Sequence, residues 1–165
     1  MKPIDLNIED YHEVVEAIHQ ESDRAAAVLG GSFIENYLAK YLQSFMIDDP
    51  DVAELFDNFG PFADYMQRYE TAYAFGFISS QQRNDLKYIG KIRNHFAHHP
   101  LDAGFDKQPV SDWCSRLSTY AIYPLEGQQQ NLTQDNRSRF MVGISLCVGN
   151  WHNSMLKRAN KASRA

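Results

Sequence analysis

The sequence predicts an all-α fold: a single-domain helical bundle of about five to six helices spanning residues 1–165. Apolar residues recur at helical spacing along most of the chain, and no stretch alternates convincingly at a period of two. Internal repeats and low-complexity segments are absent. A composition of 44% hydrophobic and 13% aromatic residues in 165 residues is enough to build one packed core.

The first part of the chain predicts two helices. An apolar stripe runs through residues 8–18 with acidic residues between its members, and Ser22-Asp23 either caps or interrupts the second helix. A broader stripe then predicts a central, buried helix over about 22–47. Gly30 and Gly31 lie inside it, although each glycine costs a helix about 1 kcal/mol relative to alanine. We therefore expect close helix packing at this pair, in preference to a ligand-binding gap.

The middle of the chain predicts a short helix, a turn and a longer helix. Pro50 suits the first turn of a short helix that continues over residues 52–56. The segment 58–61, Asn-Phe-Gly-Pro, is typical of a turn. A helix is then expected over about 61–75, with Gly76 as the residue that terminates it.

The next helix has clear signals at both ends. Ser79-Ser80 offers an N-cap, and the helix should run to about His98. Pro100 enforces the end, because the residue before a proline avoids helical angles. Residues 99–110 are expected to form a loop.

The last third predicts two more helices. A short one is expected over 110–122, followed by a polar loop over 124–130. Thr133 or Asp135 can cap a final helix that runs to about Lys157. The basic tail over 157–165 is expected to be frayed.

Charge and composition narrow the functional classes. The net charge of -5 and the pI of about 5.6 give no general attraction to nucleic-acid phosphates. No helix pair has the basic second helix of a helix-turn-helix. Cys114 and Cys147 lack metal-ligand or CxxC spacing and indicate reduced thiols in a cytosolic protein, although the sequence leaves a single disulfide open.

Targeting and cofactor signals are also missing. No signal peptide is evident, and the longest nearly apolar run, residues 25–34, is too short to cross a bilayer. We therefore expect a cytoplasmic protein without a membrane partner. The sequence holds neither a Gly-rich phosphate loop after a strand nor a GxSxG elbow, so we expect no cofactor.

The most informative segment is residues 93–98, Arg-Asn-His-Phe-Ala-His, at the end of the helix that starts near Ser79. Arg93 falls inside the apolar sector of that helix, where a guanidinium must find an anionic or carbonyl partner. Together, Arg93, Asn94 and His98 could act on a phosphodiester. The histidine would move a proton, the arginine would hold the phosphate, and the asparagine would have an orienting role. Arg93 and His98 are about 140° apart around an ideal helix. A joint site therefore needs the helix to distort near His98, or a second subunit.

Simpler interpretations stand beside this one. Arg93 can instead form an ion pair that ties two helices together. Asp57, Asp64 and Glu70 are candidate partners for Arg93 or Arg68. His98 and His99 can simply lie at the helix C-terminus, where a cation is favoured. His95 and His99 share a helical face, but no carboxylate lies at ligand spacing, so we expect no metal site. The tyrosines at 65, 69 and 73 favour core packing over base stacking.

A set of ordered short motifs resembles the mannitol operon repressor (MtlR, also written MltR) family. The resemblance covers about residues 22–100 and rests on residues 55–64, Arg68, residues 73–79, Asp85-Leu86 and residues 92–98. It implies an all-helical fold and a transcriptional regulator of sugar-alcohol uptake that lacks a recognisable DNA-binding motif. Regulation would then run through a protein partner.

The spacing of Arg93, Asn94 and His98 also resembles the RxxxxH motif of the wider HEPN superfamily of helical domains. By that resemblance the three residues correspond to the arginine, polar residue and histidine of the motif. Many HEPN domains are metal-independent ribonucleases or toxins that act as dimers, so an enzyme with an RNA substrate is the alternative function.

We rank three hypotheses. A regulator acting through protein–protein contacts comes first, and a HEPN-type ribonuclease comes second. A toxin-neutralising protein, such as an antitoxin or immunity protein, comes third because an acidic, compact chain would complement a basic partner. A homodimer is compatible with all three.

Overall fold

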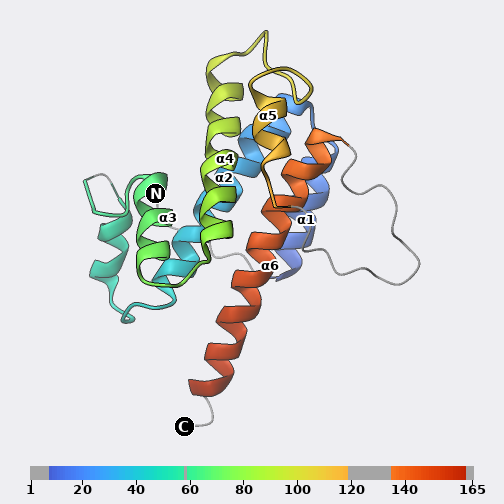
Figure 1. Cartoon of the computed structure of the whole chain (residues 1–165). Coiled ribbons are helices and arrows are strands. Elements are labelled where there is room, and N and C mark those ends of the chain that lie inside the picture. Colours follow the sequence, from blue (N-terminus) through green and yellow to red (C-terminus); the bar gives the residue numbers. More distant parts are fainter. Residues whose placement is uncertain (1–7, 58, 119–134, 163–165) are drawn as a thin grey trace.

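A computed structural model describes residues 8–57, 59–118 and 135–162, and in these segments it contains helices and no strand (Figure 1). The predicted all-α class is confirmed. The described residues form six α-helices and one 3-10 helix: α1 (Ile8–His19), α2 (Asp23–Gln43), η1 (Pro50–Phe56), α3 (Tyr65–Ala74), α4 (Ser80–His98), α5 (Val110–Ser115) and α6 (Asn136–Ala162). The predicted polar loop over 124–130 lies outside the described residues.

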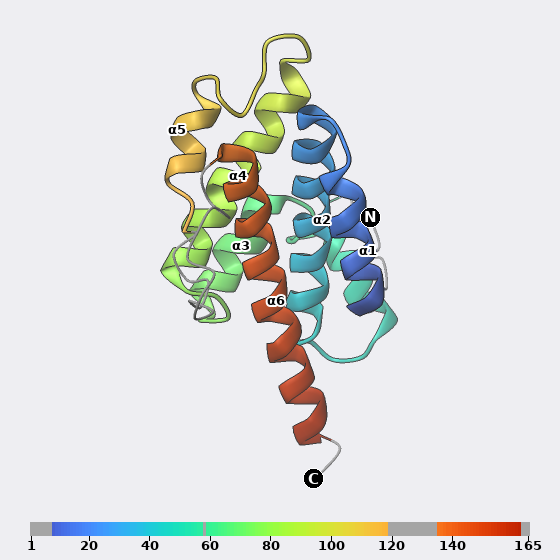
Figure 2. The same cartoon turned by 90° about the vertical axis from the view of Figure 1, so that its right-hand side faces the viewer.

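Helix α2 lies at the centre of the bundle. It packs against α1, α3, α4 and α6, while α4 also packs against α3, α5 and α6. Figure 2 shows α1, α2 and α6 side by side, with the C-terminal part of α6 extending beyond the other helices, as it also does in Figure 1. The largest fully buried side chains come from several of these elements and include Trp151, Phe56, Phe96, Phe140 and Leu38. Burial of each such side chain favours folding by roughly 1.5–3 kcal/mol.

The adjacent glycines of α2 face two different neighbours, which confirms the close packing expected there. A Cβ built on Gly30 would lie 3.0 Å from Ile144 Cδ1 of α6. A Cβ built on Gly31 would lie 2.5 Å from Arg93 Cβ of α4, closer than real contacts allow. The two glycines therefore let α6 and α4 approach the central helix closely.

Local capping signals set most helix starts. Ser22 caps α2 by accepting a hydrogen bond from the Ala25 amide, at 3.3 Å. Ser79 forms a capping box with Gln82 at the start of α4. Asp135 accepts from the Ser138 amide at the start of α6, as expected of a cap residue there, and the other candidate, Thr133, lies outside the described residues.

Several helix ends differ from the expected positions. Helix α2 stops at Gln43 because its last turn tightens, with the Phe45 amide bonded to the Leu42 carbonyl. Helix α3 begins at Tyr65 instead of near residue 61 because Asp64 is its N-cap. Helix α5 ends at Ser115, short of the expected 122, and α6 continues past Lys157 to Ala162. Gly76, with a positive φ of 73°, follows α3 as predicted.

No helix in the described ranges combines the length and apolar character needed to span a membrane.

Candidate functional site

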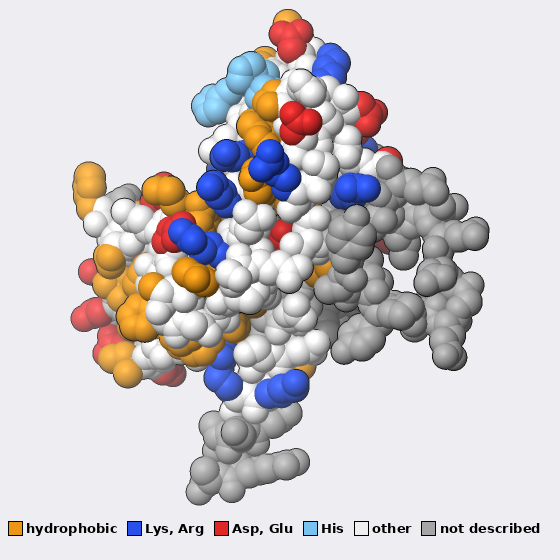
Figure 3. All heavy atoms as spheres, in the orientation of Figure 1, with side chains coloured by type: hydrophobic (Ala, Val, Ile, Leu, Met, Phe, Trp, Pro, Cys, Tyr) orange, Lys and Arg blue, Asp and Glu red, His pale blue; other side chains and the backbone are white. Residues whose placement is uncertain are grey.

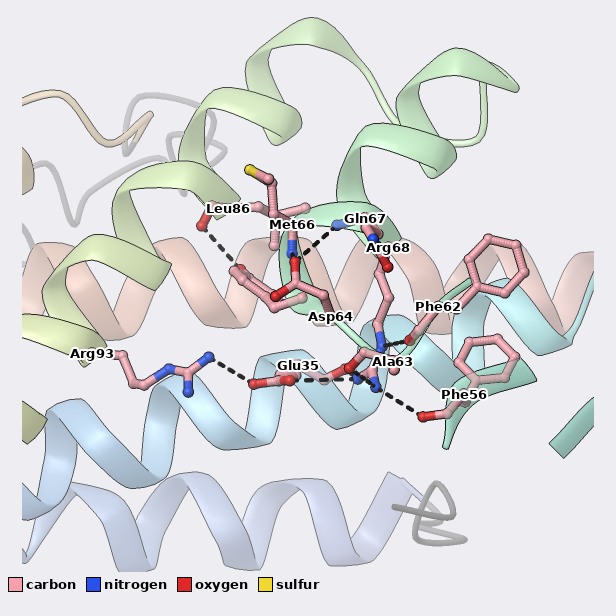
Figure 4. Close-up of polar contacts among 11 residues, drawn as sticks. Glu35, Phe56, Phe62, Ala63, Asp64, Met66, Gln67, Arg68, Leu86 and Arg93 are labelled. Atoms are coloured by element: carbon pink, nitrogen blue, oxygen red, sulfur yellow. Dashed lines mark hydrogen bonds and ion pairs between the residues drawn. The ribbon is translucent and has the colours of Figure 1, made fainter. Parts of the chain in front are cut away.

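The predicted arginine, Arg93, is bound to a carboxylate from the central helix. Arg93 Nη2 donates a hydrogen bond of 2.7 Å to Glu35 Oε2, so α4 and α2 are joined by an ion pair (Figure 4). The guanidinium also lies 5.9 Å from the centre of the Tyr65 ring. The Arg93 Nε–H is buried and meets no acceptor among the described residues. The prediction that Arg93 must find an anionic or carbonyl partner is confirmed.

The same carboxylate is shared with a second, more deeply buried arginine. Arg68 is 4% exposed, and its Nη1 lies 3.6 Å from Glu35 Oε1. Its other donors bind carbonyl oxygens, with Nε 2.6 Å from Phe62 O and Nη2 3.1 Å from Ala63 O. Burial lowers the pKa of Arg68, and the Glu35 carboxylate opposes that change, so the guanidinium remains a cation.

The acidic residues considered from the sequence do not provide the carboxylate that binds Arg93, although Asp64 and Asp57 both act electrostatically on Arg68 and oppose the lowering of its pKa by burial. Asp64 instead caps α3, accepting hydrogen bonds from the amides of Met66 and Gln67 (Figure 4). Glu70 instead pairs with Arg83 at the surface, at 2.7 Å. Glu35 escaped the sequence analysis because it stands 58 positions from Arg93, and only the docking of α2 against α4 brings the two together.

Above this ion pair lies a pocket of about 540 Å³ between α3 and α4, which we call the α3–α4 pocket. Arg93 and Asn94 both line it, together with Lys87 and Lys91 of the same helix; its other lining residues are Glu35, Ala63, Asp64, Tyr65, Met66, Tyr69 and Gly90. The lining includes two lysines, one arginine and two carboxylates, so the sum of its formal charges is slightly positive. Such a lining can hold a small anion.

Tyr65 is a buried residue that forms part of the lining of the α3–α4 pocket. Its hydroxyl donates to the Leu86 carbonyl at 3.0 Å. Gly90 leaves room for the ring, because a Cβ there would lie 2.8 Å from Tyr65 Cε1. Burial raises the pKa of the Tyr65 hydroxyl well above its usual value, so it stays protonated. The expected core packing of Tyr65 and Tyr69 is confirmed, since both are buried, but it is wrong for Tyr73, which is 40% exposed.

His98 is placed apart from the other two motif residues. It is exposed on the last turn of α4 and does not belong to the lining of the α3–α4 pocket. Helix α4 is regular to this residue, so helical rotation keeps the imidazole about 140° away from Arg93. Within one chain the structure brings Arg93 and Asn94 to one pocket, without His98.

The other two histidines of the segment interact with each other. The rings of His95 and His99 are stacked with centroids 4.2 Å apart, and His99 caps α4. Burial, with a smaller contribution from His99, lowers the pKa of His95. Among the residues that the structure describes, no group of three or more histidine, cysteine or acidic side chains could hold a metal ion. Cys114 and Cys147 are buried free thiols.

Comparison with known proteins first defines the class of fold. No family model and no curated protein matches this sequence. The arrangement of helices is nevertheless that of two solved structures, one of an MtlR–HPr complex and one of a possible transcriptional regulator, so the chain has an MtlR-like helical fold.

Two structures carry that statement. One is a chain of the MtlR–HPr complex from Escherichia coli, with a TM-score of 0.65, 16% identity, and coverage of 85% of this chain and 96% of that one. The other is a possible transcriptional regulator, YggD, from Shigella flexneri, with a TM-score of 0.63, 16% identity, and coverage of 92% and 98%. At this identity the likeness establishes the fold alone.

Proposed function

We propose that this chain is an MtlR/MltR-like regulator that affects transcription by binding a partner protein, without a DNA-binding motif of its own. The observation that carries the proposal is the fold match to a chain solved in complex with HPr, which extends over 96% of that chain. The second match is to a possible transcriptional regulator. The net charge of -5 agrees with this mode of action, because an acidic chain is not drawn to DNA phosphates.

The direct experiment is binding of the purified chain to HPr from the same cell. Titration calorimetry and size-exclusion chromatography should show a complex of fixed stoichiometry, and light scattering would give the oligomeric state of the chain alone. Deletion of the gene should change transcription of a limited set of genes. If HPr does not bind and transcription is unchanged in the deletion strain, the proposal fails.

A HEPN-type ribonuclease remains the second candidate, because Arg93 and Asn94 line one cationic pocket. In this function Arg93 would hold the phosphate, and His98 would act as general acid or base. A single chain keeps His98 outside the pocket, so this function calls for the imidazole of a second copy.

The ribonuclease is tested with variants that leave the core intact. Asn94 and His98 are both exposed, so Asn94→Ala and His98→Ala should fold normally. RNA cleavage in the presence of a chelator should fall in both variants if this function holds. Mixing the His98→Ala variant with an Asn94→Ala variant should restore part of the activity in a shared dimer. Equal cleavage by wild type and both variants removes this candidate.

A further inference from the structure

A row of alternating basic and aromatic side chains crosses the outer face of α4 and α5. Arg116 and Lys91 both lie over the ring of Tyr88, at 5.7 and 5.5 Å from its centroid. Lys91 also lies 5.6 Å from the centre of the Trp113 ring, and that ring makes a T-shaped contact with the His95 ring, with centroids 5.8 Å apart. We call these five residues the α4–α5 row. Figure 3 shows basic side chains gathered over this part of the molecule, with apolar side chains between them.

Helix periodicity explains how the row forms. Tyr88, Lys91 and His95 recur at three- and four-residue steps along α4, and Trp113 and Arg116 are three apart at α5. The packing of α5 against α4 brings the two sets together. The Arg116 guanidinium also donates to the Tyr88 hydroxyl at 3.2 Å, so its side chain is held in place at both the ring and the hydroxyl.

The cations of the row form no ion pair with the described part of the chain. Lys91 and Arg116 are exposed, and neither forms an ion pair with a described residue; the same holds for neighbouring Lys87. By contrast, Arg83 and Arg93 each bind a carboxylate. A chain with a net charge of -5 therefore presents a local positive surface with fixed geometry.

We propose that the α4–α5 row binds an acidic segment of a partner protein, through carboxylates that meet Lys91 and Arg116. This inference rests on the proposed function, since it names the surface and the chemistry by which the partner is held. Cation–π contacts hold these side chains in position before binding, which reduces the entropy lost when they are immobilised. Charge complementarity of this kind fixes orientation and accelerates encounter.

The row fits an acidic protein segment better than a nucleic acid. Bases bind by stacking on open aromatic faces, whereas the Tyr88 ring is already contacted by Lys91 and Arg116. A polynucleotide would also extend beyond the row over a molecule of net negative charge, where repulsion opposes binding. A short acidic segment need not extend beyond the positive surface, so it avoids this repulsion.

The probe is a short fluorescent oligo-glutamate peptide, and the test variant is Lys91→Glu with Arg116→Glu. The control, Arg24→Glu with Lys157→Glu, makes the same change in net charge at two exposed residues outside the row. We expect the row variant to bind the peptide at least about tenfold more weakly, with the control close to wild type. Wild-type binding should weaken steeply with salt. A neutral variant, Lys91→Gln with Arg116→Gln, should also lose affinity and guards against misfolding of the charge-reversed chain.

Two results with the peptide and RNA probes would overturn the inference. One is equal peptide affinity in the row variant and the control. The other is tighter binding of wild type to a labelled single-stranded RNA of the same charge, which would assign the surface to nucleic acid. Titration with HPr separates the two proposals: no HPr binding by wild type counts against the partner proposed above, while equal HPr binding by wild type and row variant counts against the row.

Discussion

Glu35 on α2 lies between Arg93 of α4 and Arg68 of α3, and its two carboxylate oxygens are divided between them. Oε2 is 2.7 Å from Arg93 Nη2, and Oε1 is 3.6 Å from Arg68 Nη1. All three side chains are at least three-quarters buried, with exposed fractions of 25%, 23% and 5% for Arg93, Glu35 and Arg68. One carboxylate therefore joins three helices beneath the α3–α4 pocket.

Replacing Glu35 with glutamine should destabilise the fold, because it leaves two guanidiniums close together without a counter-charge. The expected loss is about 1–3 kcal/mol of unfolding free energy, measured by urea denaturation. The matched control is Glu70→Gln, which breaks the more exposed pair with Arg83 and should change stability by less than about 1 kcal/mol. Equal effects in the two variants would show that the shared carboxylate has no special importance.

Gly31→Ala should destabilise the protein although alanine is the better helix former. The added methyl group would collide with Arg93 Cβ, and overpacking of this kind costs about 1–3 kcal/mol. In Gly149→Ala, within α6, the added Cβ meets nothing within 4 Å, so this control should gain up to about 1 kcal/mol. Thermal melting of both variants decides the point, and a stabilised Gly31→Ala protein would contradict the close approach of α2 and α4.

Asp85 should make stability depend on pH. Burial raises the pKa of this carboxyl above its usual value, and a hydrogen bond from the Ser118 amide opposes part of the rise. The folded state therefore binds the proton more tightly than the unfolded state. The resulting stabilisation is present at low pH and is lost as pH rises through the raised pKa. Asp85→Asn keeps an acceptor for the Ser118 amide but does not titrate. The stability of this variant relative to wild type should therefore increase as the pH rises through the raised pKa of Asp85.

Asp135 provides the control of opposite sign. Hydrogen bonds from Ser138 lower its pKa, so its stabilising contribution is present above the usual pKa and is lost as pH falls. Asp135→Asn should therefore lose stability relative to wild type at the higher pH. Denaturation curves at a series of pH values test both variants, and identical pH profiles for the two would contradict the assignment.

His95 should titrate below the usual histidine range in proton NMR. Burial is the larger cause of its lowered pKa, and the neighbouring His99 is the smaller one. Replacement of His99 with asparagine should therefore raise the pKa of His95 part of the way back. An unchanged or further lowered pKa in this variant would show that the stacked histidine pair does not influence the titration.

The sequence predicts those features of the fold that depend on neighbouring residues. The caps at Ser22 and Ser79, the terminating Gly76 and the stop at Pro100 are local signals, and the structure confirms each. The Gly30-Gly31 pair could also be interpreted correctly, because glycines inside a strongly apolar helix have few purposes other than close packing.

The candidate site was only partly predictable, because its contacts join residues far apart in the chain. The place of Arg93 on the apolar side of its helix predicts that it needs an anionic or carbonyl partner. The identity of that partner, Glu35, depends on how α2 docks against α4. The α4–α5 row likewise depends on the docking of a short helix that comes after a loop. His98 matches the motif spacing but lies outside the pocket that Arg93 and Asn94 line. Motif spacing alone therefore does not show that two side chains come together in one chain.

Arg68 restricts which related sequences can share the chain path before α3. Its guanidinium binds the carbonyls of Phe56, Phe62 and Ala63, so a single planar side chain fixes that segment together with backbone hydrogen bonds such as the one from the Phe62 amide to the Leu55 carbonyl. A lysine offers a compact ammonium that cannot reproduce such a fork. Homologues that retain arginine here should keep the connection between η1 and α3 at the same length, whereas insertions and deletions should occur in those that have lost it.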